Sequence, residues 1–275
     1  MAIARVNEFI HKLRSLTDPT SIENLCISEL DYLRDSLTTS SVKSSLTKYR
    51  NAIRSLGDNF DEELALHALR FLTLSKEESI DLKHQYKEQL QSDHTSLRFV
   101  KDVDAVILKA EELLESEAYT ALAVGIACLT GRRLTEILKT AKFEFIDEEH
   151  ILFTGQLKTK ESENAKIAPY PIPVLSTASI LIEALAKLRQ LRDFSALTND
   201  QVHSKTNKSC SEQVKRHFSA LIPNCKVKDL RALYATICCE YFKPDDYSDP
   251  AYMAMILGHS ELDLITPLSY QDFRI

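Results

Sequence analysis

The chain has 275 residues, of which 44% are hydrophobic and 27% charged, and its formal net charge is −6. This composition is that of a folded globular protein with one large or two ordinary domains, so an intrinsically disordered chain is excluded. A net negative charge is unusual for a protein that binds nucleic acid through the electrostatic field of the whole molecule. If this chain binds nucleic acid, it needs a local basic groove to do so.

No apolar run reaches the roughly 18 residues of a membrane span, and the amino terminus lacks the apolar segment of a signal peptide. The six cysteines form no Cys-x-x-Cys pair, which argues against a structural zinc site and for reduced, mostly buried thiols. We therefore expect a cytoplasmic protein with no metal site and no membrane partner.

Apolar residues recur every three or four positions through much of the first 91 residues, which is typical of helices. A polar stretch over 38–45 predicts a loop rich in N-cap residues. The predicted helices span about 2–16, 21–37, 46–54, 61–74 and 76–91.

Four basic residues gather around the third predicted helix: Lys43, Lys48, Arg50 and Arg54. A solvated helix face is the more common reason for such a cluster, and a surface that faces DNA phosphates is the alternative. Both interpretations stay open on this segment alone.

The helical pattern weakens around 92–103, and we place a domain boundary there. The sequence thus predicts a helical domain over 1–100 and a second domain over 101–275. No internal repeat or low-complexity tract accompanies the change.

Two strong helices open the second domain, at about 104–116 and 118–129. The later one is apolar on all sides, as a helix at the centre of a domain is. It ends at Thr130-Gly131, and a new helix predicted from about Arg132 would place Arg133 and Glu136 on one face.

The period of the pattern then changes from 3.6 to 2 residues, which predicts a small antiparallel sheet. The expected strands span 142–146, 150–154 and 167–174. Lys158 and Lys160 lie between the second and third strands, and the prolines at 169, 171 and 173 make the third an edge strand. Helices are expected afterwards over about 177–192, 213–221, 228–242 and 250–257. The predicted fold class is therefore mainly α with a small antiparallel β-sheet.

Residue types suited to phosphodiester chemistry are spread along the second domain: Arg133, Lys158, Lys228, Arg231, His259 and Tyr270. Each has a simpler explanation by itself, since arginine can pair with a nearby acid, turn lysines are common, and His and Tyr are often packed in a core. Together, two arginines, two lysines and a histidine around one tyrosine would hold a phosphodiester beside a nucleophile.

The order and the amino-acid sequences of these segments resemble those of a known family. Thr-Gly-Arg-Arg-Leu-Thr-Glu-Ile over 130–137 resembles the first-arginine box of the tyrosine recombinases. Gln-Leu-Lys158-Thr-Lys followed by Pro-Tyr-Pro-Ile-Pro is similar to their lysine-bearing hairpin, and Lys228-Asp-Leu-Arg231 to the box usually written His-x-x-Arg. Leu-Gly-His259 resembles the Leu-Gly-His box, and Tyr270 stands where the nucleophile does. Five boxes in order over about 104–273 are a specific signal.

The lysine at position 228, in place of the usual histidine, narrows the resemblance to the protelomerases, or telomere resolvases. These relatives of the tyrosine recombinases turn replicated telomere junctions into covalently closed hairpin ends. The resemblance implies a tyrosine-recombinase-like catalytic domain preceded by a helical DNA-binding domain.

Carried over box by box, the resemblance implies a role for each residue. Tyr270 would attack the phosphate and form a 3′-phosphotyrosine, and Arg133 and Arg231 would hold the non-bridging oxygens. Lys158 would be the general acid at the 5′-oxygen. Lys228 would bind phosphate or donate a proton, His259 would bind the phosphate or accept the tyrosine proton, and Glu136 would orient its neighbours. The expected DNA contacts are Arg132, Lys160 and the basic cluster Lys43, Lys48, Arg50 and Arg54.

The expected function is hairpin telomere formation on double-stranded DNA that carries an inverted-repeat telomere junction, with self-association of two protomers on that DNA. The phosphotyrosyl bond conserves the backbone energy, so no ATP, cofactor or catalytic metal is expected. With five residues after Tyr270, we expect no carboxyl-terminal DNA-binding domain, and we expect Tyr270 to act in cis. The resemblance also implies a bacterial nucleoid, or a phage or plasmid gene, as the setting.

Three alternatives remain at this point. An ordinary integrase or resolvase would use the same chemistry and yield recombinants. A catalytically silent DNA-binding protein would keep the fold without the reaction. A helical adaptor would fit the acidic charge but would leave the boxes unexplained.

Overall fold

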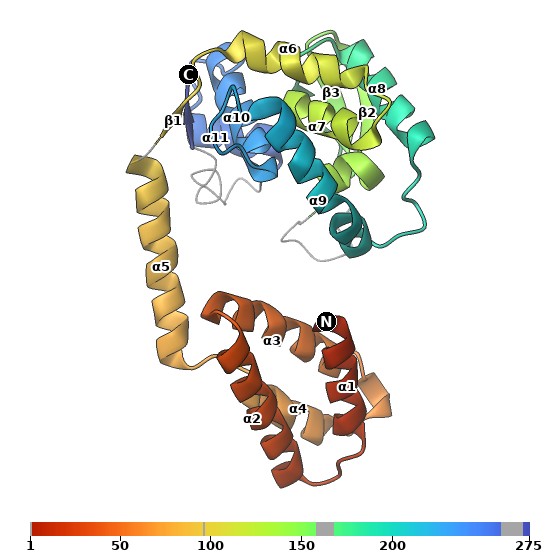
Figure 1. The fold of residues 1–275 in the computed structure, drawn as a ribbon, viewed down its shortest axis with the longest axis vertical. Coiled ribbons are helices and arrows are strands. Elements are labelled where there is room, and N and C mark those ends of the chain that lie inside the picture. The colour runs from red at the N-terminus through yellow and green to blue at the C-terminus, as the bar shows by residue number, and fades with distance from the viewer. Residues whose placement is uncertain (1, 96, 158–167, 260–271) are drawn as a thin grey trace. The chain divides into compact units, whose positions relative to one another are not determined.

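The computed structural model describes residues 2–95, 97–157, 168–259 and 272–275. The chain divides into two compact units, Met1–Gln91 and Ser92–Ile275, which are called unit 1 and unit 2 below (Figure 1). No helix among the described residues is long and apolar enough to cross a membrane.

Unit 1 is helical, and four of its helices share one core. They are α1 (Ala2–Arg14), α2 (Pro19–Ser36), α3 (Thr39–Arg54) and α4 (Glu62–Phe71), with a short 3₁₀ turn, η1 (Gly57–Asn59), before α4. Phe9, Ile22 and Tyr49 are buried in that core. The apolar stripe of each helix is what the sequence periodicity predicted.

The predicted loop over 38–45 is wrong, because α3 begins at Thr39. The Thr38 side chain accepts a hydrogen bond from the Ser41 amide and so caps the helix. Val42 and Leu46, one turn apart, then enter the core. The run of Ser and Thr is therefore the cap and the solvent face of a helix.

Helix α5 (Lys76–Thr95) begins in unit 1 and runs past its end at Gln91, and its described side chains are mostly exposed. Its first turn is fixed, since Glu78 accepts from the Ser75 amide at 2.7 Å and pairs with Arg34 of α2 at 3.0 Å. Even the apolar Ile80 and Tyr86 of this helix are exposed, which is typical of a helix that connects two domains.

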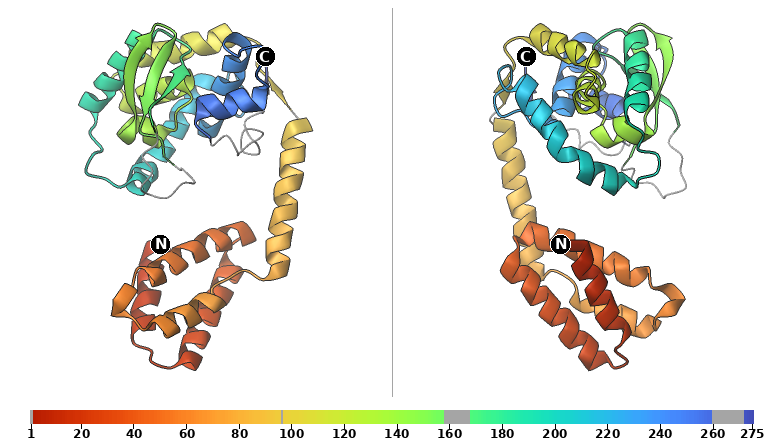
Figure 2. Two further views of the ribbon diagram at one scale, coloured as in Figure 1. Left: turned by 180° about the vertical axis from the view of Figure 1, so that it is seen from behind. Right: turned by 45° about the vertical axis from the view of Figure 1, so that its right-hand side comes forward.

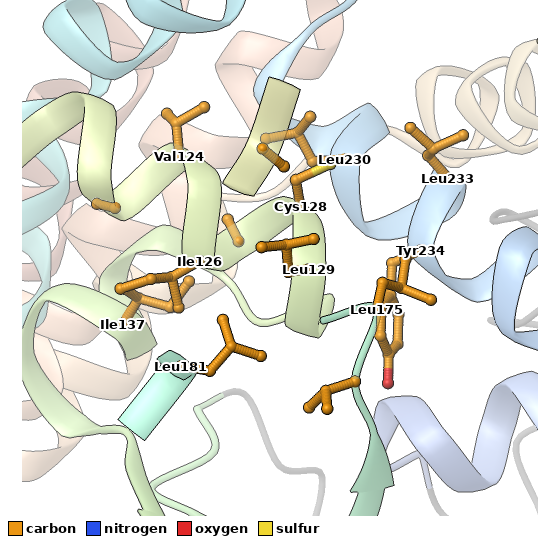
Figure 3. Packing of buried hydrophobic residues seen from close by; sticks show 14 of the residues in the cluster. Val124, Ile126, Cys128, Leu129, Ile137, Leu175, Leu181, Leu230, Leu233 and Tyr234 are labelled. Atoms are coloured by element: carbon orange, nitrogen blue, oxygen red, sulfur yellow. The ribbon is translucent and has the colours of Figure 1, made fainter. Parts of the chain in front are cut away.

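Unit 2 is built around α7 (Tyr119–Thr130), as the sequence predicted. Every residue of α7 from Thr120 to Thr130 is buried. The helix packs against α6 (Val103–Leu114), α8 (Ala178–Leu191), α9 (Asn199–Phe218) and α10 (Val227–Tyr241). Figure 3 shows Val124, Ile126 and Leu129 of α7 among the side chains of this core.

A three-stranded antiparallel sheet lies at the surface of unit 2, with α8 packed against its first strand (Figure 2). Its order is β2 (Lys142–Asp147), β3 (His150–Thr154) and β4 (Tyr170–Pro173). The alternate residues Ile151 and Phe153 of β3 face the core, and β4 is an edge strand, as its prolines predicted. A mainly helical fold with a small antiparallel sheet is thus confirmed.

One long helix and two short strands of unit 2 differ from the sequence prediction. Helix α9 begins at Asn199 and not near residue 213, because Thr198 and Gln201 form a capping box. Its buried residues recur every four positions, from Val202 to Phe218, within a very polar sequence. Two short strands were not predicted: β1 (Arg98–Phe99) and β5 (Phe273–Arg274), which pair in parallel.

Candidate active site

The centre of the candidate site is the turn that ends α7. Gly131 lies in the left-handed region, with φ of 65°, and caps the helix. A Cβ at this position would lie 2.2 Å from the ring of Tyr234, so only glycine fits. The chain thus turns sharply and delivers Arg132 and Arg133 to one place.

The helix predicted from Arg132 begins later, at Leu134, and widens at once into a π-helix, η2 (Glu136–Thr140). Arg133 therefore stands just before the helix, and its carbonyl accepts from the Ile137 amide at 3.0 Å. The side chains of Arg133 and Glu136 still meet, as their spacing predicted, in an ion pair of 2.7 Å.

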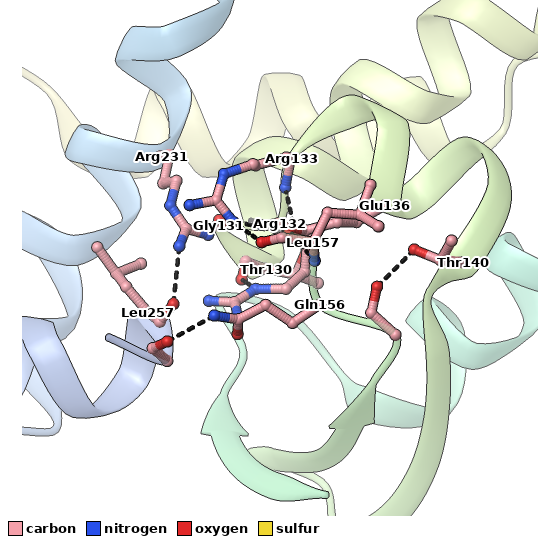
Figure 4. Close-up of polar contacts among 12 residues, drawn as sticks. Thr130, Gly131, Arg132, Arg133, Glu136, Thr140, Gln156, Leu157, Arg231 and Leu257 are labelled. Atoms are coloured by element: carbon pink, nitrogen blue, oxygen red, sulfur yellow. Dashed lines mark hydrogen bonds and ion pairs between the residues drawn. The ribbon is translucent and has the colours of Figure 1, made fainter. Parts of the chain in front are cut away.

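Glu136 is fully buried and receives three hydrogen bonds (Figure 4). Its carboxylate accepts from the Arg133 amide at 2.9 Å, from Arg133 Nη1 at 2.7 Å and from the Leu157 amide at 3.0 Å. Arg133 Nη1 also donates to the Leu157 carbonyl at 3.1 Å. The root of the β3–β4 connection is thus tied to Arg133 and Glu136 together.

The charge of Glu136 is stabilised by its surroundings. Burial is the largest single effect and by itself raises the pKa of this carboxyl. Arg231, Arg133 and Arg132, with the hydrogen bond from the Arg133 amide, outweigh it and lower the pKa below its ordinary value. One buried carboxylate therefore sits among three guanidinium groups, and the cluster keeps a net positive charge.

Arg132 was expected to contact DNA, and the structure contradicts that expectation. Its side chain is 1% exposed. Its guanidinium donates to the Thr130 carbonyl at 3.1 Å, to the Tyr170 hydroxyl at 2.7 Å and to the Ile256 carbonyl at 2.7 Å. Arg132 holds the site together from inside and offers no surface to a phosphate.

Arg231 lies on the second turn of α10 and is 5% exposed. Its Nη1 donates to the Gly131 carbonyl at 2.6 Å and its Nη2 to the Leu257 carbonyl at 2.7 Å. Arg231 therefore joins the arginine turn to the end of α11 (Asp249–Leu257). Lys228, three residues earlier, is exposed.

The start of α10 is held by Asp229, which the sequence boxes did not assign to any role. Asp229 Oδ2 accepts from the Lys226 amide at 2.9 Å and from Arg98 Nη1 of β1 at 2.8 Å. The Arg98 guanidinium also lies over the Phe273 ring of β5, 4.2 Å from its centroid. One arginine thus links the turn that carries Lys228 to both small strands.

His259 follows the end of α11, where Gly258 adopts φ of 67°. The His259 amide donates to the Ala254 carbonyl at 2.8 Å, which sets the backbone of this turn. Gln156 Nε2 donates to the Gly258 carbonyl. The histidine is therefore attached to the same frame as Arg133 and Arg231.

Three of the predicted residues, Lys158, Lys160 and Tyr270, lie outside the described residues. The chain is described again from Asp272, whose carbonyl accepts from the Arg98 amide at 3.0 Å. Phe273 then enters the core of unit 2.

The basic cluster around α3 belongs to unit 1. Lys43, Lys48 and Arg54 are exposed there. Arg50 is half-buried and donates to the carbonyls of Leu69 and Leu72 at 2.6 and 3.2 Å. This places Arg50 in the packing of unit 1 and makes it a poor candidate for a phosphate contact.

Gln156, Tyr170, Arg98 and Asp229 take part in the site and were missed as functional residues. Gln156 and Tyr170 lie within the two segments that resemble the lysine-bearing hairpin of the family. That resemblance is the sequence feature that could have identified them as functional residues. Among the described ranges, no group of three His, Cys, Asp or Glu residues is arranged to hold a metal ion.

Comparison with known proteins identifies the family to which this sequence is similar. Residues 98–273 match the model described as the telomere resolvase ResT/TelK catalytic domain. Telomere resolvase ResT of Borreliella burgdorferi is 24% identical over 197 residues, which are 70% of this chain and 43% of that protein. Protelomerase of Escherichia phage N15 is 27% identical over 173 residues, 56% of this chain and 26% of that protein. The chain thus spans less than half the length of these relatives.

The solved structure of protelomerase TelA, covalently complexed with substrate DNA, is similar over 100% of this chain and 88% of that one. The TM-score is 0.89 and the sequence identity 27%. A second TelA structure, of a mutant complexed with a DNA hairpin product, also superposes with a TM-score of 0.89. The similarity extends over both units of the chain.

Proposed function

Because the chain belongs to the telomere resolvase family, we propose that it cleaves replicated telomere junctions in double-stranded DNA and rejoins the strands as covalently closed hairpins. The observation that carries this proposal is that the structure brings three of the sequence boxes, those with Arg133, Arg231 and His259, together at the turn that ends α7. Arg231 binds the Gly131 carbonyl beside Arg133, and it also binds the Leu257 carbonyl two residues before His259.

In the proposed first step, the phenol of Tyr270 gives its proton to His259 and attacks the scissile phosphate. The bond from phosphorus to the 5′-oxygen breaks, and a 3′-phosphotyrosine forms. Lys158 gives the departing 5′-oxygen its proton. Arg133 and Arg231 stabilise the charge that grows on the non-bridging oxygens, with His259 and Lys228 at the same phosphate.

In the proposed second step, the 5′-hydroxyl of one strand gives its proton to Lys158 and attacks the phosphotyrosine on the opposite strand. The tyrosine leaves with a proton returned by His259, and the two strands of each end become one continuous hairpin. Bond energy is conserved in both steps, so the balance needs no ATP. Two protomers on one inverted-repeat junction supply the two tyrosines.

We propose that Tyr270 acts within its own protomer. The chain two residues beyond it is bonded to β1 of the same unit, through the Arg98 amide and the Asp272 carbonyl. Phe273 is 5% exposed in the core that also holds α10. This attachment two residues after Tyr270 supports attack within the same protomer.

We assign DNA binding to the helical residues 1–100 as part of the same proposal, with Lys43, Lys48 and Arg54 as phosphate contacts. Lys160 is proposed as a further contact from the β3–β4 connection. The reaction would take place in the bacterial cytoplasm, on the DNA of the cell, a phage or a plasmid, as the origins of the relatives suggest.

The test uses the whole chain and a plasmid that carries the junction formed by the replicated ends of its own replicon. Denaturing gels should show snap-back hairpin ends, and a nicked suicide substrate should trap protein on DNA. Tyr270→Phe should bind the same DNA without forming the covalent species. Recombinant plasmids in place of hairpins would identify an integrase, and binding by the wild type without any covalent species would identify a silent DNA-binding protein.

A further inference from the structure

The carboxyl end of α11 is bound by side chains from three other parts of unit 2. The last carbonyl groups of a helix have no amide of the same helix to accept from. Here the Ile256 carbonyl accepts from Arg132, the Leu257 carbonyl from Arg231 and the Gly258 carbonyl from Gln156. Figure 4 shows Arg231 and Gln156 reaching this helix end from different elements.

Two of these three donors are cations, which suit the partial negative charge at a helix carboxyl end. Gln156 is neutral, and its position next to Gly258 is what distinguishes it. A Cβ on Gly258 would lie 2.1 Å from Gln156 Oε1 and 2.3 Å from the Tyr170 hydroxyl oxygen. Gln156 and Tyr170 therefore fill the space beside the residue that precedes His259.

The amide of Gln156 has its own fixed orientation. The Tyr170 hydroxyl accepts from Arg132 Nη1 at 2.7 Å and donates to Gln156 Oε1. This leaves Gln156 Nε2 to donate to the Gly258 carbonyl. Burial, the largest cause, raises the pKa of Tyr170 against the opposing effect of Arg132 and Arg231, so the hydroxyl keeps its proton and continues to donate.

Gln156 also belongs to the root of the β3–β4 connection. Leu157, the next residue, donates its amide to Glu136 at 3.0 Å and accepts from Arg133 at 3.1 Å. Lys158 follows directly in the sequence. Two consecutive residues thus join the Arg133–Glu136 pair on one side to the backbone of His259 on the other.

We propose that Gln156 and Tyr170 are positioning residues that set the place of His259 relative to Arg133 and Leu157. This inference rests on the proposed function for its meaning in catalysis. Neither residue touches the DNA in this scheme. Their effect passes through the Gly258 carbonyl and the glycine turn that carries the histidine.

The substitutions Gln156→Leu and Tyr170→Phe remove the polar groups and keep nearly the same volume. We expect Gln156→Leu to slow formation of the covalent species on a suicide substrate by roughly 10- to 100-fold, because small misplacements of a catalytic group are costly. The affinity for the DNA should stay the same. Tyr170→Phe should show a smaller loss, since Gln156 can still donate to Gly258.

The matched control is Tyr234→Phe. Tyr234 is a buried tyrosine of the same core, and its hydroxyl donates to the Pro173 carbonyl at 2.7 Å, outside this network. Once corrected for the folded fraction by denaturant unfolding, its rate should equal that of the wild type.

A double-mutant cycle with His259→Ala separates positioning from general damage. If Gln156 acts through His259, Gln156→Leu should cost little in the His259→Ala background. The same fold-loss in both backgrounds would overturn the proposal.

A second measurement does not depend on cleavage. In NMR spectra of protein labelled at histidine, the His259 ring resonance, assigned by its loss in His259→Ala, should shift in Gln156→Leu and stay in place in Tyr234→Phe. An unshifted resonance in Gln156→Leu would overturn the inference. A shifted resonance in a protein whose wild type does not cleave DNA would leave the positioning network standing and remove the proposed function.

Discussion

The buried carboxylate of Glu136 holds Arg133 at two points, by the backbone amide at 2.9 Å and by the guanidinium at 2.7 Å. The backbone contact fixes where the residue starts, and the side-chain contact fixes where it points. Since the same carboxylate accepts from the Leu157 amide, the arginine and the β3–β4 connection share one anchor.

Glu136→Gln should therefore damage both stability and catalysis. The amide keeps the size of the side chain but brings two N–H donors toward groups that are themselves donors, and it removes the charge between three guanidiniums. We expect a loss of roughly 3–5 kcal/mol in the free energy of unfolding, as for other broken buried ion pairs. Denaturant unfolding gives the number. Glu8→Gln, in the exposed pair with Lys12, is the control and should leave stability nearly unchanged.

The free energy of unfolding should depend on pH in a way that reflects the charge of Glu136. The folded-state pKa of Glu136 lies below its ordinary value, so its charge stabilises the fold fully above the unfolded-state pKa of about 4.3. That contribution is lost as the pH falls through the folded-state value. Urea unfolding at several pH values should show a constant gap between wild type and Glu136→Gln near neutrality, and a narrowing gap below about pH 4.5. A gap that widens toward acid would contradict the assignment.

Arg98 and Asp229 should behave as a coupled pair. Asp229 is 2% exposed, and its second oxygen, Oδ1, has no hydrogen-bond partner within the described part of the chain, so the carboxylate depends on Arg98 and the Lys226 amide. Arg98→Met should cost about 3 kcal/mol or more, because it leaves a buried charge without its cation. Adding Asp229→Asn should recover part of that loss. If the two single costs simply add in the double mutant, the pair is not coupled.

Gly131→Ala should be more damaging than the same change at another left-handed glycine. At Gly131 a Cβ meets the Tyr234 ring at 2.2 Å, whereas at Gly57, with φ of 50°, it meets no atom within 4 Å. Gly57→Ala should cost about 1–2 kcal/mol from the backbone conformation alone. Gly131→Ala should exceed this by the energy needed to move a buried ring, and it should also displace Arg133. Hydrogen exchange of the whole chain locates each loss in its own unit.

The central helix and the five boxes were visible in the sequence because each is local. An apolar run such as α7 is recognised from its own residues. A glycine followed by arginines indicates a turn that carries positive charge. The burial of the Glu136 carboxylate could not be predicted from the sequence. It depends on contacts with Arg231 and Leu157, which lie far along the chain. The same holds for Arg132, whose partners Tyr170 and Ile256 belong to other segments.

Helix α9 shows a different reason for failure. Its polar residues dominate the composition, and the single buried stripe from Val202 to Phe218 includes a threonine and a cysteine. A helix with so narrow an apolar face gives a weak periodic signal. Strands β1 and β5 are two residues long and exist only because they pair with each other.

The pairing of those two strands has a consequence for the order in which unit 2 forms. Arg98 is matched with Phe273, about 175 positions later in the chain. As the chain leaves the ribosome, α7 and the sheet can assemble while β1 still lacks its neighbour, and contacts so distant in sequence form late. The pairing of β1 with β5 is thus among the later contacts of unit 2 to form, and the bond from the Arg98 amide to the Asp272 carbonyl forms with it.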